Sequence, residues 1–136
     1  MKVGEHIYEV EKLIVNSPII RSFQIKERWI RRFDAYIKVR VNLIDDSILE
    51  ITQFLHADEE NYAEIKRYNY HWMDSSNRLR RRWDNVRHYP DLPNFPHHHH
   101  DGDEKNVLPG EPMNLFKVLD IIAEELNQKK TTSGRQ

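Results

Sequence analysis

The segment Tyr36-Ile-Lys-Val-Arg-Val-Asn-Leu-Ile44 alternates between apolar and polar side chains without interruption. A period of two is typical of a β-strand with one buried face and one face in solvent. The next residues, Asp45-Asp46-Ser47, favour a turn because their side chains bond nearby backbone groups, and residues 48–54 then resume the apolar pattern. Residues 36–54 therefore predict an antiparallel hairpin at the centre of a sheet.

The hairpin continues downstream into two further strands. Residues 56–64 are polar and predict a loop, whereas Tyr68, Tyr70 and Trp72 alternate with polar neighbours and predict a third strand. Residues 74–77 indicate another turn. The strand that returns has two expected faces, with Leu79, Arg81 and Trp83 on one and Arg78, Arg80, Arg82 and Asp84 on the other.

The segments at both ends predict helices. Val3, Ile7, Val10 and Ile14 recur at helical spacing before a stop at Asn16-Ser17-Pro18, and residues 19–30 predict an irregular strand or edge hairpin. Prolines and glycines between residues 88 and 110 exclude long regular elements. A final helix begins at Glu111-Pro112 or Asn114, and its apolar stripe consists of Leu115, Val118, Leu119, Ile122 and Leu126.

These elements predict the α+β class. We expect an antiparallel meander of about four to five strands, with the N-terminal and C-terminal helices packed on the sheet, in one domain over residues 1–128, followed by a polar tail at 129–136. No apolar run approaches the roughly 20 residues that span a bilayer, and no apolar segment at the start directs secretion. We therefore expect a cytoplasmic protein without membrane association.

Charge is segregated along the chain, although the net charge is only −1. Residues 21–40 and 66–87 are rich in Arg and Lys, whereas residues 45–64 are acidic. Basic segments that meet in the fold can attract phosphates, although arginines on outward strand faces are also ordinary solubilising residues. The absence of cysteine excludes disulfides and thiolate chemistry.

The most unusual part of the chain joins Arg82-Trp83-Asp84-Asn85 to the run His97 to His100. Imidazole exchanges protons near neutral pH, so two histidines that flank a phosphodiester can act as general base and general acid while arginine stabilises the phosphorane. In an extended chain either His97 with His99, or His98 with His100, shares a face. The sequence does not choose between the two pairs.

Other interpretations of the same residues remain open. The His and Arg side chains can form a solvated surface, and Asp84 and Asn85 can satisfy turn backbone. Tyr68, Tyr70 and Trp72 suit a core better than base stacking. The same basic surface also suits a non-enzymatic module that binds nucleic acid or an acidic protein. Residues 97–100, with Asp84, can bind a metal.

Three motifs resemble the TumE family of toxins from prokaryotic toxin–antitoxin pairs: Tyr-x-Tyr-His at 68–71, Arg-Trp-Asp-Asn at 82–85 and Phe-Pro-His-His-x-His at 95–100. The resemblance implies a growth-inhibiting toxin that is neutralised by a small helix-turn-helix antitoxin, with RNA as a plausible target. The resemblance is also compatible with a homo-oligomer.

Our leading hypothesis is metal-independent RNA cleavage that needs no cofactor. The candidate catalytic residues are His71, Arg82, Asp84, His88, His98 and His100, and the candidate substrate-binding residues are Arg78, Arg80, Arg81, Asn85 and His97. The antitoxin is expected to cover the groove between the hairpin of residues 68–84 and the expected loop of residues 95–100, where its carboxylates would meet Arg80 and Arg82.

Overall fold

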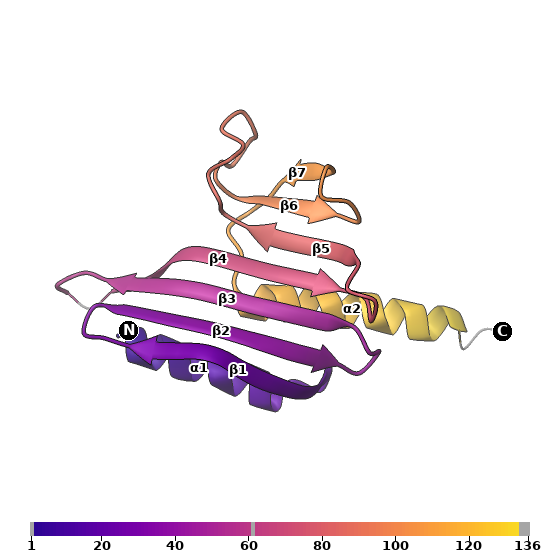
Figure 1. The fold of residues 1–136 in the computed structure, drawn as a ribbon, viewed down its shortest axis with the longest axis horizontal. Helices are drawn as coiled ribbons and strands as arrows, with labels where there is room; N and C mark the ends of the chain where they lie inside the picture. Colours follow the sequence, from indigo (N-terminus) through magenta and orange to yellow (C-terminus); the bar gives the residue numbers. More distant parts are fainter. Residues whose placement is uncertain (1, 61, 134–136) are drawn as a thin grey trace.

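A computed structural model describes residues 2–60 and 62–133 of the chain. The fold is α+β, with one helix before and one helix after the strands of a single antiparallel sheet (Figure 1). The elements in chain order are α1 (Val3–Asn16), β1 (Ile20–Ile30), β2 (Asp34–Leu43), β3 (Ile48–Ala57), β4 (Ala63–Met73), β5 (Leu79–Asp84), β6 (His98–Asp101), β7 (Val107–Pro109) and α2 (Leu115–Ser133).

The sheet is a seven-stranded meander in which each strand pairs with the next one along the chain. The expected four to five strands were therefore too few. The two additional strands, β6 and β7, come from the segment rich in proline and glycine, and they span only 4 and 3 residues. Strands this short leave no periodic signal in the sequence. They are defined by pairing, of β6 with β5 and of β7 with β6, rather than by an apolar pattern.

The predicted core face is confirmed. Residues paired across strands lie on the same face, and the row Val39, Ile51, Tyr70 and Trp83 is buried throughout. Both helices cover this face (Figure 1). The apolar stripe of α1 and that of α2 contribute Val3, Ile7, Val10, Ile14, Leu115, Val118, Leu119 and Ile122 to the same core.

The aromatic side chains of β4 belong to this core, as expected. Tyr68, Tyr70 and Trp72 are at most 4% exposed. Trp72 donates its indole N–H to Ser47 Oγ at 3.0 Å, and Gln53 donates to the Tyr70 hydroxyl at 2.6 Å. Burial raises the pKa of Tyr68 to about 12. These rings are therefore enclosed, and base stacking is not their role.

Turns and helix ends follow the sequence closely. Asp46 and Asn77 adopt positive φ in the two expected hairpin turns, and Asn114 Oδ1 accepts from the Lys117 backbone N–H at the start of α2. The expected loop at 56–64 is shorter, because β3 continues to Ala57 and β4 begins at Ala63. Residues 129–133 of the expected tail are helical, and residues 134–136 lie outside the described part.

No helix of the described residues lies on the second face of the sheet, and we call it the open face (Figure 1). Two rows of polar residues cross it in register: Lys38, Thr52, Asn69, Asp84 and His98 form one, and Arg40, Glu50, His71, Arg82 and His100 form the other. The candidate residues of β5 and β6 therefore lie opposite the core. Neither helix in the described residues is long and apolar enough to cross a bilayer.

Candidate functional site

The candidate site forms where β5 meets β6. Arg82 is directly opposite His100 and Asp84 is directly opposite His98. The prediction of a loop over residues 95–100 was wrong for residues 98–100, since His98–Asp101 is a strand. Because alternate residues of a strand share a face, this strand turns His98 and His100 together toward Asp84. The structure thus selects one of the two histidine pairs that the sequence left open.

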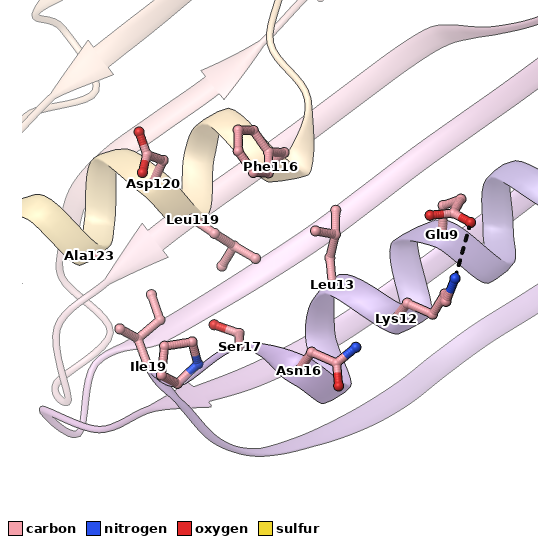
Figure 2. Close-up of a pocket in the computed structure, with 11 residues that line it drawn as sticks. Glu9, Lys12, Leu13, Asn16, Ser17, Ile19, Phe116, Leu119, Asp120 and Ala123 are labelled. Atoms are coloured by element: carbon pink, nitrogen blue, oxygen red, sulfur yellow. Dashed lines mark hydrogen bonds and ion pairs between the residues drawn. The ribbon is translucent and has the colours of Figure 1, made fainter.

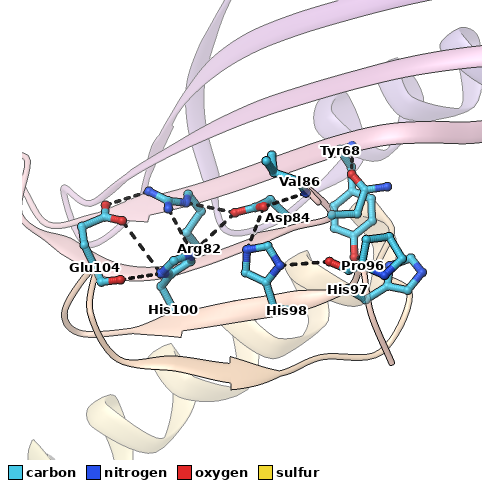
Figure 3. Close-up of polar contacts among 10 residues, drawn as sticks. Tyr68, Arg82, Asp84, Val86, Pro96, His97, His98, His100 and Glu104 are labelled. Atoms are coloured by element: carbon cyan, nitrogen blue, oxygen red, sulfur yellow. Dashed lines mark hydrogen bonds and ion pairs between the residues drawn. The ribbon is translucent and has the colours of Figure 1, made fainter. Parts of the chain in front are cut away.

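Four side chains, Arg82, Asp84, His98 and His100, make up a connected group that we call the Asp84 cluster (Figure 3). His98 Nε2 lies 2.9 Å from Asp84 Oδ1, and Arg82 Nε lies 3.1 Å from Asp84 Oδ2. Arg82 also reaches His100 Nε2 at 3.0 Å. Asp84, His98 and His100 are at most 3% exposed, so the polar contacts replace water almost completely.

The two histidines occupy different hydrogen-bonding states. His98 Nδ1 lies 3.0 Å from the Pro96 carbonyl, and its Nε2 faces the Asp84 carboxylate. Both nitrogens of the His98 ring thus face oxygen acceptors, the arrangement that suits an imidazolium. His100 donates from Nδ1 to the Glu104 carbonyl at 2.8 Å, and its Nε2 meets Arg82. Because arginine only donates, Nε2 of His100 holds a lone pair and this ring is assigned as neutral.

The charges of the cluster balance with the help of one more residue. Arg82 is positive, Asp84 is negative, and a protonated His98 adds a second positive charge. Glu104 adds the second negative charge through an ion pair of 2.7 Å with Arg82 Nη1. Buried charges cost several kcal/mol each unless they are paired and hydrogen-bonded. A neutral, fully bonded group of this kind tolerates burial, yet it contributes less to stability than an apolar core of the same volume would.

The connection between β5 and β6 holds the cluster in place and covers it. Asp84 Oδ1 accepts the Val86 backbone N–H at 3.0 Å, and Asn85 bonds the backbone of Tyr68 and Lys66. Asp84 therefore satisfies backbone after the strand, as its interpretation as a turn residue predicted, and it serves the cluster as well. Asn85 instead bonds the backbone of the neighbouring strand β4. The Tyr89 ring lies edge-on to His98 at 4.9 Å and to His100 at 6.2 Å, which shields both imidazoles.

The remaining candidate histidines lie around the cluster. His71 pairs with Arg82 across β4 and β5, and burial together with the Arg82 charge lowers its pKa. His88 is exposed, 6.3 Å from the Tyr89 ring. His97 stacks on Tyr68 and bonds its hydroxyl at 2.8 Å, and burial lowers the pKa of His97.

The arginines that precede Arg82 do not reach the cluster. A register shift between Trp72 and Met73 interrupts the alternation of β5. Arg80 consequently lies over the Trp72 ring at 3.9 Å and pairs with Asp45, so the expected face for Arg80 was wrong. Arg81 pairs with Glu125 of α2 and with Asp101, on the helix-covered side. Arg78 is exposed at the preceding turn.

Two contributors were missed in the sequence analysis. Tyr89 lies in a segment without periodicity, and its closeness to the Asp-Asn motif was the one feature of the sequence that could have pointed to it. Glu104 follows His100 by four residues, and the β6–β7 turn brings its backbone carbonyl and carboxylate back to His100 and Arg82. No spacing rule for a helix or strand links Glu104 to these partners, so the sequence carried no signal for it.

Three residues of the cluster are also a donor set for a cation. Asp84, His98 and His100 each offer one ligand atom, and these atoms lie within 4.8 Å of one another. Two imidazoles and one carboxylate suit Zn²⁺ or Fe²⁺. The Arg82 guanidinium already contacts Asp84 Oδ2 and His100 Nε2. A cation held by all three residues would therefore have to displace Arg82.

A separate hollow of about 530 Å³ lies between α1 and α2, on the other side of the sheet (Figure 2). Leu13, Ile19, Leu119 and Ala123 supply apolar walls, and Glu9 pairs with Lys12 at 3.5 Å on its rim. No group of titratable side chains converges there among the described residues. The described residues of this hollow therefore lack the interconnected ionisable groups that the Asp84 cluster has.

A family model described as Toxin TumE matches residues 10–129, a range that includes the whole sheet and the Asp84 cluster. The chain belongs to the TumE toxin family. No curated protein and no solved structure matches it. Membership of the TumE family makes this protein the toxin of a toxin–antitoxin system and implies an antitoxin as its partner. The resemblance of the three motifs to TumE toxins is thus confirmed.

Proposed function

We propose that this TumE toxin inhibits growth by cleaving RNA at the Asp84 cluster, without a metal. One observation carries the proposal: the His98 ring, whose nitrogens both face oxygen acceptors, and the His100 ring, whose Nε2 faces a guanidinium, lie with ring centroids 5.2 Å apart beside the Asp84 carboxylate. General acid–base cleavage needs one protonated and one neutral imidazole, and these two settings suit one of each. Buried histidines with such specific partners are also more typical of functional sites than of structural ones.

The roles follow from the two hydrogen-bonding states. Nε2 of His100 takes the proton of the ribose 2′-hydroxyl while its oxygen attacks phosphorus. His98 gives its Nε2 proton to the departing 5′-oxygen as the P–O5′ bond breaks. The products are a 2′,3′-cyclic phosphate and a 5′-hydroxyl. The Pro96 carbonyl holds the His98 ring in position through Nδ1. Asp84 gives up its contact with Nε2 of His98 to the leaving oxygen, and Arg82 leaves His100 to stabilise charge on the phosphorane.

The cluster is closed in the unbound protein, so substrate entry requires movement of Tyr89. Its ring covers both imidazoles, and it comes from a connection rich in prolines rather than from a strand. Arg82 retains 20% exposure of its side chain and is the member of the cluster that a phosphate meets first. Loops that open to admit substrate are common in enzymes that exclude water during reaction.

The test is cleavage of RNA by the purified full chain in the presence of EDTA. We expect His98→Ala and His100→Ala each to lose at least about 100-fold in rate, since general acid–base groups contribute 10²–10⁴-fold. His99→Ala is the matched control, because His99 lies on the opposite face of β6. Intact RNA with wild-type protein, or stoichiometric inhibition without turnover, would instead favour a module that acts by binding.

A second candidate function, metal binding, is favoured by the donor set of Asp84, His98 and His100. We propose calorimetric titration of tag-free protein with Zn²⁺. One equivalent bound per chain, lost in Asp84→Asn and kept in His99→Ala, would support a metal site. Absence of stoichiometric binding, together with RNA cleavage that EDTA leaves unchanged, would reject it and leave the metal-independent mechanism.

We also propose that the antitoxin, expected to have a helix-turn-helix fold, covers the Asp84 cluster. Arg82 is the cation that an acidic antitoxin side chain reaches there, since Arg80 lies over the Trp72 ring, away from the cluster. Arg82→Glu should weaken the complex by about 2–5 kcal/mol if the charge is buried in it, and Arg80→Glu should change the affinity little. Equal affinities of both variants in a calorimetric titration would place the antitoxin elsewhere.

A further inference from the structure

We propose that a row of aromatic side chains on the open face is a stacking platform that holds single-stranded RNA beside the Asp84 cluster. The aromatic row consists of Trp29 on β1, Tyr36 on β2 and Phe54 on β3, and it ends at Arg67 on β4. The inference rests on the proposed function for the identity of the ligand, and it names the substrate class as unpaired RNA.

Strand register places these residues side by side. Trp29 is opposite Tyr36, Tyr36 is opposite Phe54, and Phe54 is opposite Arg67. The Trp29 and Tyr36 rings are 6.0 Å apart and nearly parallel, with an interplanar angle of 16°. The Phe54 ring meets Trp29 edge-on at 6.3 Å. The row is therefore a continuous aromatic surface across three strands.

The setting of this row differs from that of the core aromatics. Tyr68, Tyr70 and Trp72 are enclosed beneath the helices, whereas Trp29, Tyr36 and Phe54 are only half-buried on a face that no helix covers. Packing in the core does not explain three large rings on a solvent face. Contiguous exposed apolar surface rimmed by polar residues is typical of a binding site.

Positive charge accompanies the rings. The Arg31 guanidinium lies 4.3 Å from the Trp29 ring centre, and the Arg67 guanidinium lies 4.9 Å from that of Phe54. Both arginines are exposed, so their outer N–H groups are accessible to phosphate. Aromatic faces with flanking cations suit a nucleic acid whose bases are unpaired, because stacked bases in a duplex present no free face.

A hollow of about 270 Å³ connects the row with the cluster. It is lined by Tyr36, Thr52, Phe54, Arg67, Tyr68, Asn69, Asn85 and Val86, among which there is no carboxylate. Asn69 is opposite Asp84, and Asn85 follows Asp84 directly. A strand of RNA whose base stacks on Phe54 would thus place a phosphate further along its chain near Arg82. The hollow extends from the platform to residues that adjoin the Asp84 cluster.

Binding can be measured separately from cleavage. The probe is a fluorescein-labelled, mixed-sequence 12-mer of 2′-O-methyl RNA, which lacks the attacking hydroxyl. We expect Phe54→Leu and Tyr36→Leu each to raise its Kd by about 5- to 150-fold, since stacking contributes about 1–3 kcal/mol per base. Arg67→Gln should lower the slope of log Kd against log salt concentration by the contribution of about one phosphate contact. Binding should also quench Trp29, because Trp72 and Trp83 are buried.

Matched variants keep the result interpretable. Phe54→Tyr retains a ring and should restore binding, and Phe116→Leu alters a 63% exposed ring on α2 and should not change it. Three results would each overturn the platform. The first is a Kd for Phe54→Leu and Tyr36→Leu within twofold of wild type. The others are an equal affinity of wild type for duplex and single-stranded RNA, and no binding of the probe by wild type. RNA cleavage that His98→Ala abolishes but Phe54→Leu leaves unchanged in KM would overturn it while sparing the proposed function. If Phe54→Leu loses RNA binding but the wild-type protein does not cleave RNA, the platform stands and the proposed function is overturned.

Discussion

The two faces of the sheet use the same strands for different purposes. On β3, Leu49, Ile51 and Leu55 point into the core and are fully buried, whereas the intervening Glu50, Thr52 and Phe54 lie on the open face. The core face is continuous and apolar, and two helices cover it. The open face is polar in two rows and aromatic in a third. Alternation therefore separates the residues that stabilise the fold from those free to carry chemistry.

The difference also explains how charge can be buried without disturbing the core. Asp84, His98 and His100 are as inaccessible as the core, yet they belong to the open face and are covered by Tyr89 rather than by a helix. Their partners come from β5, β6 and the β6–β7 turn, at the end of the sheet where strands are short. Changes in this region need not alter the long hairpins of β1 to β4.

The largest effect is expected from a change on the core face. Ile51→Ala should lower the free energy of unfolding by about 2–5 kcal/mol, because the side chain is fully buried and leaves a cavity. Thr52→Ala, the next residue on the open face, should cost less than about 1 kcal/mol. Urea unfolding of both variants measures the contrast. Similar losses would show that the two faces do not differ in their contribution to stability.

An intermediate effect is expected from the cluster. Asp84→Asn keeps the shape of the side chain but leaves Arg82 and His98 without their shared buried counter-ion. We expect a loss of about 1–3 kcal/mol in urea unfolding. Asp101→Asn is the control, since Asp101 pairs with Arg81 at 3.8 Å near the surface. Equal stability of Asp84→Asn and wild type would show that the cluster is not held by charge pairing.

The smallest effect concerns the pH dependence of stability. Burial, followed by the Arg82 charge, lowers the pKa of His71 below its ordinary 6.5, so the folded state binds fewer protons there than the unfolded chain does. Stability should consequently fall as the pH drops from 6.5 through the lowered pKa. His71→Gln should reduce this fall, as measured by urea midpoints at pH 7.5 and pH 5.5. His88→Gln, on the exposed connection, should retain it.

The central sheet could be predicted because its apolar residues alternate over long strands. The pattern from Tyr36 to Ile44 has one solution, in which Val39 and Val41 are buried and Lys38 and Arg40 are not. The strand β6 could not be predicted in the same way. A run of four identical histidines has no alternation, so only pairing with β5 determines which of them face Asp84.

The site was predicted in part. Four of the candidate residues lie together in the structure: Arg82, Asp84, His98 and His100. They could be selected from the sequence because imidazole, carboxylate and guanidinium groups are chemically conspicuous. Arg80 does not lie with them, since the register shift in the β4–β5 pair turns it onto Trp72. The aromatic row was missed for a different reason. Trp29, Tyr36 and Phe54 are far apart in sequence, and only the register of three strands brings them together.

The edges of the sheet determine whether it can grow. The outer edge of β1 is long, and such an edge can template pairing with a second chain and aggregation. Two register shifts, at Arg21 and Lys26, distort it and insert a positive charge at each irregular position. At the opposite edge, β7 ends at Pro109, which has no backbone N–H to offer a newcomer. The two edges thus oppose the pairing of strands between copies of this toxin, and with it assembly into fibres.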